Sequence, residues 1–251
     1  MKPIQLTMAV AAIFASAACN AENGTGANSN SAGTAQAVPP PQGGDWSTVV
    51  TQTAEGGYLM GNPSAGVKLV EFGSMTCPHC ADFDEAALQP LIDKYVKSGR
   101  VSFEFRNYVR DSLDVTASLI ARCGGPKQFF PLTRQLFAGQ SEFMGKLQAT
   151  PAAQQQALSS LPPQQQFTEI AKIAGLQQWA AQRGLPSAKS SACLADEAEV
   201  NRLVEMNGDT TSKYPDFRGT PSFVLNGDLL DNASTWQTLE PQIQAALGER
   251  G

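Results

Sequence analysis

The feature that most constrains the fold is a short apolar run, residues 67–72, that leads into Cys77-Pro78-His79-Cys80. Such a run is typical of a buried strand. An apolar pattern with helical spacing begins directly after the second cysteine. Two cysteines separated by two residues, placed between a strand and a helix, are typical of a thiol–disulfide redox motif. We therefore expect the other elements to position or tether this dithiol.

Two cysteines with this spacing can also be half of a zinc site or a structural disulfide. A tetrahedral zinc site needs a second pair of ligands. The 251 residues contain no second cysteine pair of this spacing, and His79 is the only histidine. The sequence therefore favours a redox pair and predicts no metal and no cofactor.

The N-terminal residues predict export from the cytoplasm. Residues 4–18 are apolar and rich in Ala, and they are too short for a mature transmembrane helix, which is typical of a signal peptide. The sequence Ser16-Ala17-Ala18-Cys19 resembles a bacterial lipoprotein signal, with Ser16 in place of the usual large aliphatic residue. On this interpretation residues 1–19 form the signal segment and Cys19 is lipidated. The alternative is ordinary cleavage after Ala17 or Ala18.

Residues 20–44 predict a flexible linker, because Gly, Asn, Ser, Ala and Pro dominate and few apolar side chains could drive folding. With a lipidated Cys19, this linker would tether a periplasmic domain to a membrane. The alternative is a disordered terminus without a role. The net charge of −5 argues against nucleic acid as a partner. No dimerisation segment is evident, so we expect a monomer.

Export also bears on the remaining cysteines, because disulfides form and persist outside the cytoplasm. With Cys19 set aside, four cysteines allow three pairings. Cys77 and Cys80 are close enough to pair locally, which leaves Cys123 with Cys193. The alternative for the second pair is two buried free thiols.

Residues 45–112 predict the first part of an α/β fold. Residues 58–60 are compatible with a short strand. The helix after the redox motif should be kinked at Pro90 and end at Gly99. A second strand is expected from Val101 to about Asn107, where apolar and polar residues alternate.

Residues 113–212 show no strand pattern and predict an all-helical insertion, large enough to form a subdomain. One helix in it is expected to continue from Phe167 to about Gly184. Farther on, Asp196 and Glu199 predict a capping box at the start of another helix.

Residues 213–251 predict a return to the sheet. A strand at residues 223–225 precedes Asn226-Gly227, a strong hairpin signal. Ser234 with Gln237 predicts the start of a last helix. A parallel β–α–β beginning and an antiparallel hairpin end together predict a mixed central sheet flanked by helices.

Three segments together resemble the DsbA branch of the thioredoxin superfamily. They are Val70-Glu71-Phe72, Cys77-Pro78-His79-Cys80, and Gly219-Thr220-Pro221-Ser222 before an apolar strand. The resemblance covers about residues 58–248 and implies a thioredoxin fold with a helical insertion. Gly73 and Thr76 stand where many relatives carry larger or aromatic residues, a difference that bears on substrate docking.

The chemistry of the motif predicts a role for each residue. Cys77 should be the exposed, attacked sulfur and Cys80 the resolving thiol, with Pro78 and His79 as the dipeptide between them. Unpaired N–H groups and the dipole at a helix N-terminus stabilise a thiolate, and a protonated His79 adds positive potential. A stabilised thiolate makes the disulfide a stronger oxidant. The alternative for His79 is a surface residue without effect.

The resemblance implies further site residues. Glu71 would lie beneath the buried cysteine and shuttle the proton of Cys80; the alternative is a charge at the strand edge that faces water. Pro221 would be a cis-proline against the dithiol, and Thr220 would offer backbone groups to an extended substrate; the alternative is a turn proline. A second disulfide, Cys123 with Cys193 here, is similar to that of some alphaproteobacterial relatives.

We therefore expect an exported thiol–disulfide oxidoreductase that oxidises cysteines of unfolded or reduced envelope proteins. Its reoxidation by a quinone-linked membrane partner is implied by the resemblance. One alternative is the reverse chemistry, a disulfide reductase or isomerase of the same fold. Another is a tethered metal-binding or chaperone-like module. The sequence does not decide the direction of electron flow.

Overall fold

The computed structural model describes residues 38–40 and 44–249. The expected signal segment, Cys19 and most of the expected linker lie outside the described residues. Val38 is held by the Trp46 indole N–H, which donates to its carbonyl oxygen at 2.7 Å. The fold proper begins at Trp46, in the short helix η2 (Trp46–Thr48).

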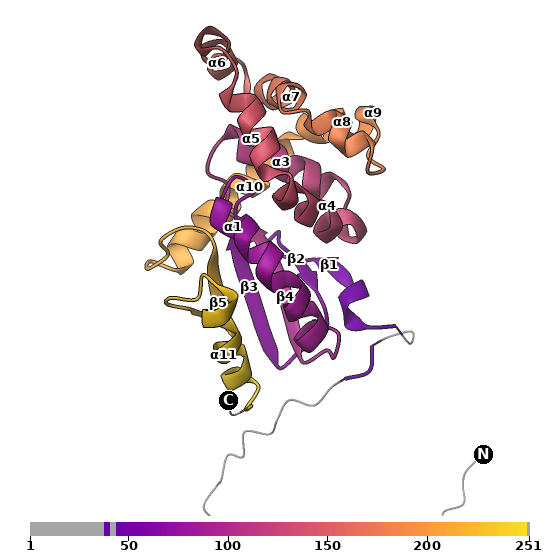
Figure 1. Ribbon diagram of the computed structural model, residues 1–251, viewed down its shortest axis with the longest axis vertical. Helices are drawn as coiled ribbons and strands as arrows, with labels where there is room; N and C mark the ends of the chain where they lie inside the picture. Colours follow the sequence, from indigo (N-terminus) through magenta and orange to yellow (C-terminus); the bar gives the residue numbers. More distant parts are fainter. Residues whose placement is uncertain (1–37, 41–43, 250–251) are drawn as a thin grey trace, which may run out of the picture. The chain divides into compact units, whose positions relative to one another are not determined.

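The centre of the fold is a six-stranded mixed sheet (Figure 1). The spatial order is β1-β2-β4-β3-β5-β6, and β3 and β4 form the parallel pair while the other neighbours are antiparallel. The strands are β1 (Val50–Gln52), β2 (Tyr58–Met60), β3 (Val67–Gly73), β4 (Val101–Asn107), β5 (Ser222–Leu225) and β6 (Asp228–Leu229). The strand before the redox motif is therefore central, with a partner on each side, as its apolar run predicts.

One continuous helix follows the redox motif and crosses a face of the sheet (Figure 1). It consists of α1 (Pro78–Phe83), η3 (Asp84–Leu88), α2 (Gln89–Leu91) and η4 (Ile92–Val96). The segments η3 and η4 are π-helical and flank Pro90. A proline inside a helix removes a backbone hydrogen bond and crowds the preceding turn. The chain accommodates Pro90 by widening the turns on both sides.

The last helix, α11 (Trp236–Ala246), lies beside this helix. The Tyr95 hydroxyl donates to Glu240 at 2.9 Å, and Leu239 and Ile243 are fully buried. The predicted cap at Ser234 is wrong by one residue. Thr235 is the N-cap, and its side chain and that of Thr238 form the capping box. A hydroxyl at either position could begin the helix, and the pairing of Thr235 with Thr238 marks the start that is formed.

Eight helices lie between β4 and β5 in the described chain, at the end of the sheet where the redox motif begins (Figure 1). They are α3 (Ser112–Cys123), α4 (Pro126–Ala138), α5 (Gln140–Gln148), α6 (Ala152–Ser159), α7 (Pro163–Ile173), α8 (Leu176–Ala181), α9 (Ser187–Leu194) and α10 (Glu197–Lys213). Three prolines of the glutamine-rich residues 148–166 lie at helix starts, where a missing N–H costs little: Pro151 before α6, and Pro162 and Pro163 at the start of α7.

Two predictions inside the insertion need correction. The single helix expected from Phe167 to Gly184 is two helices, because Gly175 has a φ of 74° and ends α7 in the left-handed region. The capping box of Asp196 and Glu199 is half formed. The Asp196 carboxylate accepts from the Glu199 N–H at 3.2 Å, but the Glu199 side chain pairs with Arg122 instead.

Aromatic side chains join the insertion to the sheet. Phe129 of α4 stacks on Tyr58 of β2 with ring centroids 4.0 Å apart. It also lies against Phe105 of β4, and its neighbour Phe130 lies against Phe103. These rings are all buried, so the insertion shares one hydrophobic core with the sheet.

Candidate active site

The redox loop, residues 74–77, ends at the first turn of α1. Cys77 is the N-cap residue and Pro78 occupies the first turn, a position that suits proline because its missing N–H would be unpaired there in any case. The N–H groups of Cys80 and Ala81 donate to the Cys77 carbonyl oxygen at 3.1 and 3.2 Å. Both cysteines are buried, and both are thiols in this structure. The prediction that Cys77 is exposed is therefore wrong for this structure, because its sulfur lies against the Thr220 carbonyl oxygen. The start of α1 thus places two sulfur atoms together, one of them at the helix end.

The two thiols differ in their tendency to ionise. The pKa of Cys77 is lowered to about 5, chiefly because Cys80 donates a hydrogen bond to the thiolate, helped by the Thr220 hydroxyl and by Arg110, and opposed by burial. The pKa of Cys80 is raised, first by burial and then by Cys77 and Glu71. At neutral pH the pair is therefore a Cys77 thiolate beside a Cys80 thiol, which suits a nucleophilic or leaving-group cysteine.

Glu71 lies in β3 beneath this pair. It is 3% exposed, and its Oε1 atom has no hydrogen-bond partner within the described chain. Its pKa is raised well above normal by burial, and further by Asp84 and Cys77. Burial also raises the pKa of Asp84 to about 6, although Arg134 opposes this shift. Glu71 is therefore no water-facing charge, and it can accept and return a proton inside the protein.

The segment before β5 contacts the Cys77 sulfur. The peptide bond between Thr220 and Pro221 is cis. The Cys77 thiol donates to the Thr220 carbonyl oxygen at 3.1 Å. The Thr220 hydroxyl is buried and has no bonded partner in the described residues, which leaves it available to the thiolate. β5 begins at Ser222, directly after this segment. The backbone beside Cys77 therefore leads straight into β5.

A groove of about 440 Å³ opens beside the redox motif. His79 lies at its edge with its side chain 82% exposed, and its Nδ1 atom is 3.6 Å from Asp82. The groove is lined from α1, from the cis-proline segment and from the start of α11, by His79, Asp82, Phe83, Ala86, Thr220, Pro221, Ser234, Thr235, Trp236 and Gln237. Its mixture of aromatic and polar walls suits a side chain of a bound peptide.

Asp114 in α3 is a site residue that the sequence analysis did not identify. It is fully buried, and its carboxylate accepts hydrogen bonds from the Ser74 hydroxyl at 2.5 Å and from the Met75 N–H at 2.8 Å. Burial raises the pKa of Asp114 to about 7, against the effect of these hydrogen bonds. The sequence holds no local signal for this contact, because 40 residues separate Asp114 from Ser74.

Arg110 and Gln140 were also not identified. The Arg110 guanidinium donates to the Thr76 carbonyl oxygen at 2.5 Å. The Gln140 side-chain amide donates to the carbonyl oxygens of Met75 and Cys77 at 3.0 and 2.9 Å. Gln140 comes from α5, so the helical insertion supplies a group that touches the redox loop directly.

The structure accounts for two unusual residues next to the dithiol, Gly73 at the end of β3 and Thr76 in the redox loop. A Cβ atom on Gly73 would lie 2.4 Å from the Phe105 ring, so a larger residue does not fit there. Thr76 is buried, and its hydroxyl donates to Asp111 at 3.1 Å. Both residues adapt the loop to its neighbours in this chain.

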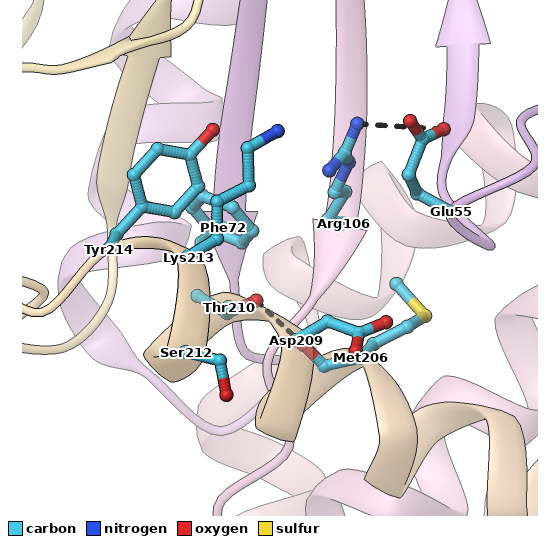
Figure 2. A pocket seen from close by; sticks show the side chains of 9 residues that line it. All are labelled: Glu55, Phe72, Arg106, Met206, Asp209, Thr210, Ser212, Lys213 and Tyr214. Atoms are coloured by element: carbon cyan, nitrogen blue, oxygen red, sulfur yellow. Dashed lines mark hydrogen bonds and ion pairs between the residues drawn. The ribbon is translucent and has the colours of Figure 1, made fainter.

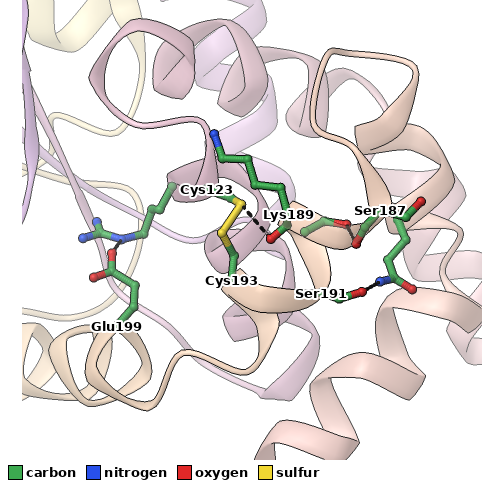
Figure 3. Close-up of a disulfide and its surroundings, with 9 residues drawn as sticks. Cys123, Ser187, Lys189, Ser191, Cys193 and Glu199 are labelled. Atoms are coloured by element: carbon green, nitrogen blue, oxygen red, sulfur yellow. Dashed lines mark hydrogen bonds and ion pairs between the residues drawn. A yellow bond between two sulfur atoms is a disulfide. The ribbon is translucent and has the colours of Figure 1, made fainter.

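Cys123 and Cys193 form a disulfide between α3 and α9 (Figure 3). Their Cα atoms are 5.7 Å apart and their sequence separation is 70 residues. Asp114 lies in the first turn of α3 and Cys123 is its last residue. Because a helix rises about 1.5 Å per residue, the disulfide lies more than two turns away from the redox loop. Its position is that of a crosslink within the insertion.

A second cavity, of about 390 Å³, lies on the other face of the sheet (Figure 2). Side chains alternate along a strand, so Phe72 and its register partner Arg106 face away from Glu71. Arg106 lies 3.8 Å from Glu55 at this cavity and donates to Glu104 at 2.7 Å. The sheet therefore separates this cavity from the buried face that holds the dithiol and Glu71.

No helix within residues 38–40 and 44–249 is long and apolar enough to cross a membrane. In the same part of the chain, no group of three or more His, Cys, Asp or Glu side chains is arranged to hold a metal ion. The expected lipidation site, Cys19, lies outside the described residues.

Comparisons with known proteins agree with this geometry. The profile of a family described as Thioredoxin matches residues 53–245. A protein-disulfide isomerase from Novosphingobium aromaticivorans is 35% identical, and the match covers 76% of this chain and 97% of that one, with a TM-score of 0.72. Wolbachia pipientis alpha-DsbA1 is 18% identical over 76% of this chain and 90% of that one, with a TM-score of 0.59, and supports the fold.

A curated relative from Rickettsia bellii, named as a protein-disulfide oxidoreductase, is 27% identical over 180 residues, which are 72% of this chain and 61% of the relative. The chain thus spans less than two thirds of the length of this relative. The Thioredoxin profile nevertheless covers most of the chain, including the redox motif and the segment before β5. The chain therefore belongs to the Thioredoxin family.

Proposed function

We propose that this protein is an exported thiol–disulfide oxidoreductase that oxidises cysteine pairs in folding envelope proteins. The observation that carries the proposal is the placement of Cys77 as the N-cap residue of α1 beside the fully buried Cys80, where the pKa of Cys77 is lowered and the pKa of Cys80 is raised. A fold that stabilises the thiolate stabilises the reduced form. The disulfide form is then the stronger oxidant.

The geometry supports a two-step exchange. In the oxidised protein a substrate thiolate attacks the Cys77 sulfur, the mixed disulfide forms, and the bond between Cys77 and Cys80 breaks. Cys80 leaves as a thiolate and takes the proton that Glu71 holds. A second substrate thiolate then attacks the substrate sulfur of the mixed disulfide, and Cys77 leaves as a thiolate. Two electrons pass to the protein, and the substrate gains a disulfide.

The substrate would lie along the cis-proline segment. In the reduced protein the Cys77 sulfur lies 3.1 Å from the Thr220 carbonyl oxygen, and an extended peptide whose own cysteine replaces this contact could pair with the same backbone. The neighbouring groove, with Trp236 and Phe83 in its walls, would receive a flanking apolar side chain. Such a site would recognise the backbone of the substrate and the size of one apolar side chain, which suits unfolded or reduced substrates of varied sequence.

The cellular context belongs to the same proposal. The signal at residues 1–19 directs the protein to the periplasm, where Cys19 carries a lipid and the linker at residues 20–44 gives the domain its reach. The protein acts as a monomer, and a quinone-linked membrane protein reoxidises the dithiol. These parts of the proposal rest on the signal sequence and on the resemblance to DsbA proteins.

A second candidate is a disulfide isomerase or reductase of the same fold. The observation that favours it is the Novosphingobium aromaticivorans structure, 35% identical to this chain, which is named a protein-disulfide isomerase. The same Cys77 thiolate would then attack wrong substrate disulfides, and the protein would have to be kept reduced. The two candidates share every site residue and differ in the stability of the Cys77–Cys80 disulfide.

The reduction potential decides between them. The protein is equilibrated at neutral pH with glutathione buffers, and the reduced fraction is measured by alkylation and mass analysis. A potential nearer to about −120 mV than to −270 mV supports an oxidase, and one near about −270 mV overturns the proposal. The Cys80→Ser variant should lose the two-electron transition while it keeps the disulfide between Cys123 and Cys193, which makes it the matched control.

A further inference from the structure

Three consecutive backbone carbonyl groups of the redox loop, those of residues 75–77, each accept a hydrogen bond from a side chain. The Gln140 amide donates to the carbonyl oxygens of Met75 and Cys77. The Arg110 Nη2 atom donates to the Thr76 carbonyl oxygen at 2.5 Å and contacts the Thr76 hydroxyl at 3.2 Å. Because the Thr76 carbonyl belongs to the peptide bond joined to Cys77, a guanidinium is held one residue from the redox sulfur.

The side chain of Arg110 is fixed by a buried anchor. Its Nε atom donates to the Ser74 hydroxyl at 2.9 Å, and that hydroxyl donates to Asp114 at 2.5 Å. The Arg110 backbone N–H donates to the same Asp114 carboxylate at 3.0 Å. Asp114 is fully buried in α3, so it holds both the backbone and, through Ser74, the guanidinium of Arg110.

We propose that Arg110 is a positioning residue of the redox site, whose guanidinium is held against the Thr76–Cys77 peptide so that its positive charge stabilises the Cys77 thiolate. The inference rests on the proposed role of Cys77 as the sulfur that forms the mixed disulfide with a substrate, but it is independent of the direction of electron flow. His79 lies within the motif, yet its side chain is 82% exposed and lies beside Asp82. Arg110 is bonded to the loop itself.

The other charges around the loop are mostly acidic. Glu71 and Asp84 lie beneath the dithiol, and burial raises the pKa of both. Asp111 accepts from the Thr76 hydroxyl, and Asp114 accepts from Ser74 and Met75. Arg110 is a cation that lowers the pKa of Cys77. It therefore offsets acidic groups that would otherwise oppose a thiolate.

The test compares neutral and charged replacements of Arg110 in the full chain. We expect Arg110→Met and Arg110→Gln to raise the pKa of Cys77 by about half a unit, because a charge near the surface acts through a high effective dielectric. The equilibrium with glutathione should shift about threefold towards the disulfide. Arg110→Lys should keep most of the wild-type pKa. The thiolate absorbance gives the pKa, and the difference should shrink at high salt.

Arg202→Met is the matched control, because Arg202 also donates to a backbone carbonyl, that of Ala54, and its removal changes the net charge equally. It should leave the pKa of Cys77 unchanged. An unchanged pKa in both neutral variants would overturn the inference. A lysine variant that behaves like the neutral ones would also overturn it, because the bonds rather than the charge would then matter. The wild-type potential tests the oxidase proposal separately.

Discussion

The depressed pKa of Cys77 predicts how the reduction potential responds to pH. In the folded, reduced protein this pKa is about 5, whereas an unperturbed cysteine has a pKa of about 8.5. Because the folded value is the lower one, the thiolate stabilises the reduced fold fully above the unfolded pKa. This stabilisation is lost as the pH falls through about 5.

The magnitude follows from the difference between pH and pKa. At pH 7 Cys77 is ionised in the fold and protonated in the unfolded chain. The two units between the pKa of about 5 and pH 7 correspond to a stabilisation of the reduced fold of at most about 2.7 kcal/mol. For a two-electron couple this is about 60 mV of added oxidising power over an unperturbed dithiol.

The assay measures the potential against thiol buffers of known potential across acidic and neutral pH. Reduction should consume two protons below pH 5 and one proton above it, so the slope should change from about 59 to about 30 mV per pH unit near the pKa of Cys77. A single slope of about 59 mV up to neutral pH would refute the reasoning. In Cys80→Ala, which removes the largest stabilising contact, direct titration should give a higher Cys77 pKa.

Three further outcomes are expected. Glu71→Gln should slow thiol exchange in stopped-flow measurements, and it should stabilise the fold at neutral pH. Because the folded pKa of Glu71 is raised, this gain should vanish below the ordinary pKa of the carboxyl group. Unchanged rates and an unchanged pH profile would remove Glu71 from the mechanism. His79→Ala should lower the potential by less than about 30 mV, since the exposed ring is screened, and an unchanged potential would leave His79 without an electrostatic role. Replacing Cys123 and Cys193 together by Ala should lower the free energy of unfolding by about 4 kcal/mol in urea titrations, from the 70-residue separation; a loss below about 1 kcal/mol would contradict this.

Much of the fold could be predicted because its signals are local. The apolar run of β3, the start of α1 at Pro78 and the Asn226-Gly227 hairpin are each encoded within a few residues. β1 (Val50–Gln52) was not predicted. It is three residues long and partly exposed, and it exists because Val50 and Gln52 pair with Met60 and Tyr58 of β2. Strand formation at such an edge depends on the partner and not on the segment alone.

The errors at Gly175, inside the helical insertion, and at the start of α11, after it, have a related cause. Apolar spacing continues across Gly175, so periodicity alone predicts one long helix, yet a glycine can adopt a positive φ at little cost. The start of α11 was misplaced by one residue, because Ser234 and Thr235 carry equivalent capping groups. In both cases several local conformations are nearly equal in energy, and the surrounding packing selects one.

The sequence by itself determined where the residues proposed for the chemistry lie among the elements: two cysteines at a strand-to-helix junction, Glu71 in the strand before them, and Thr220-Pro221 before a later strand. The tertiary structure alone decided which side chains bond to the redox loop around Cys77. Arg110, Asp114 and Gln140 reach the redox loop from 34 to 65 residues away in the sequence. No periodicity or motif records such contacts, because they depend on how the helical insertion packs against the sheet. Those contacts place charge and hydrogen bonds around Cys77.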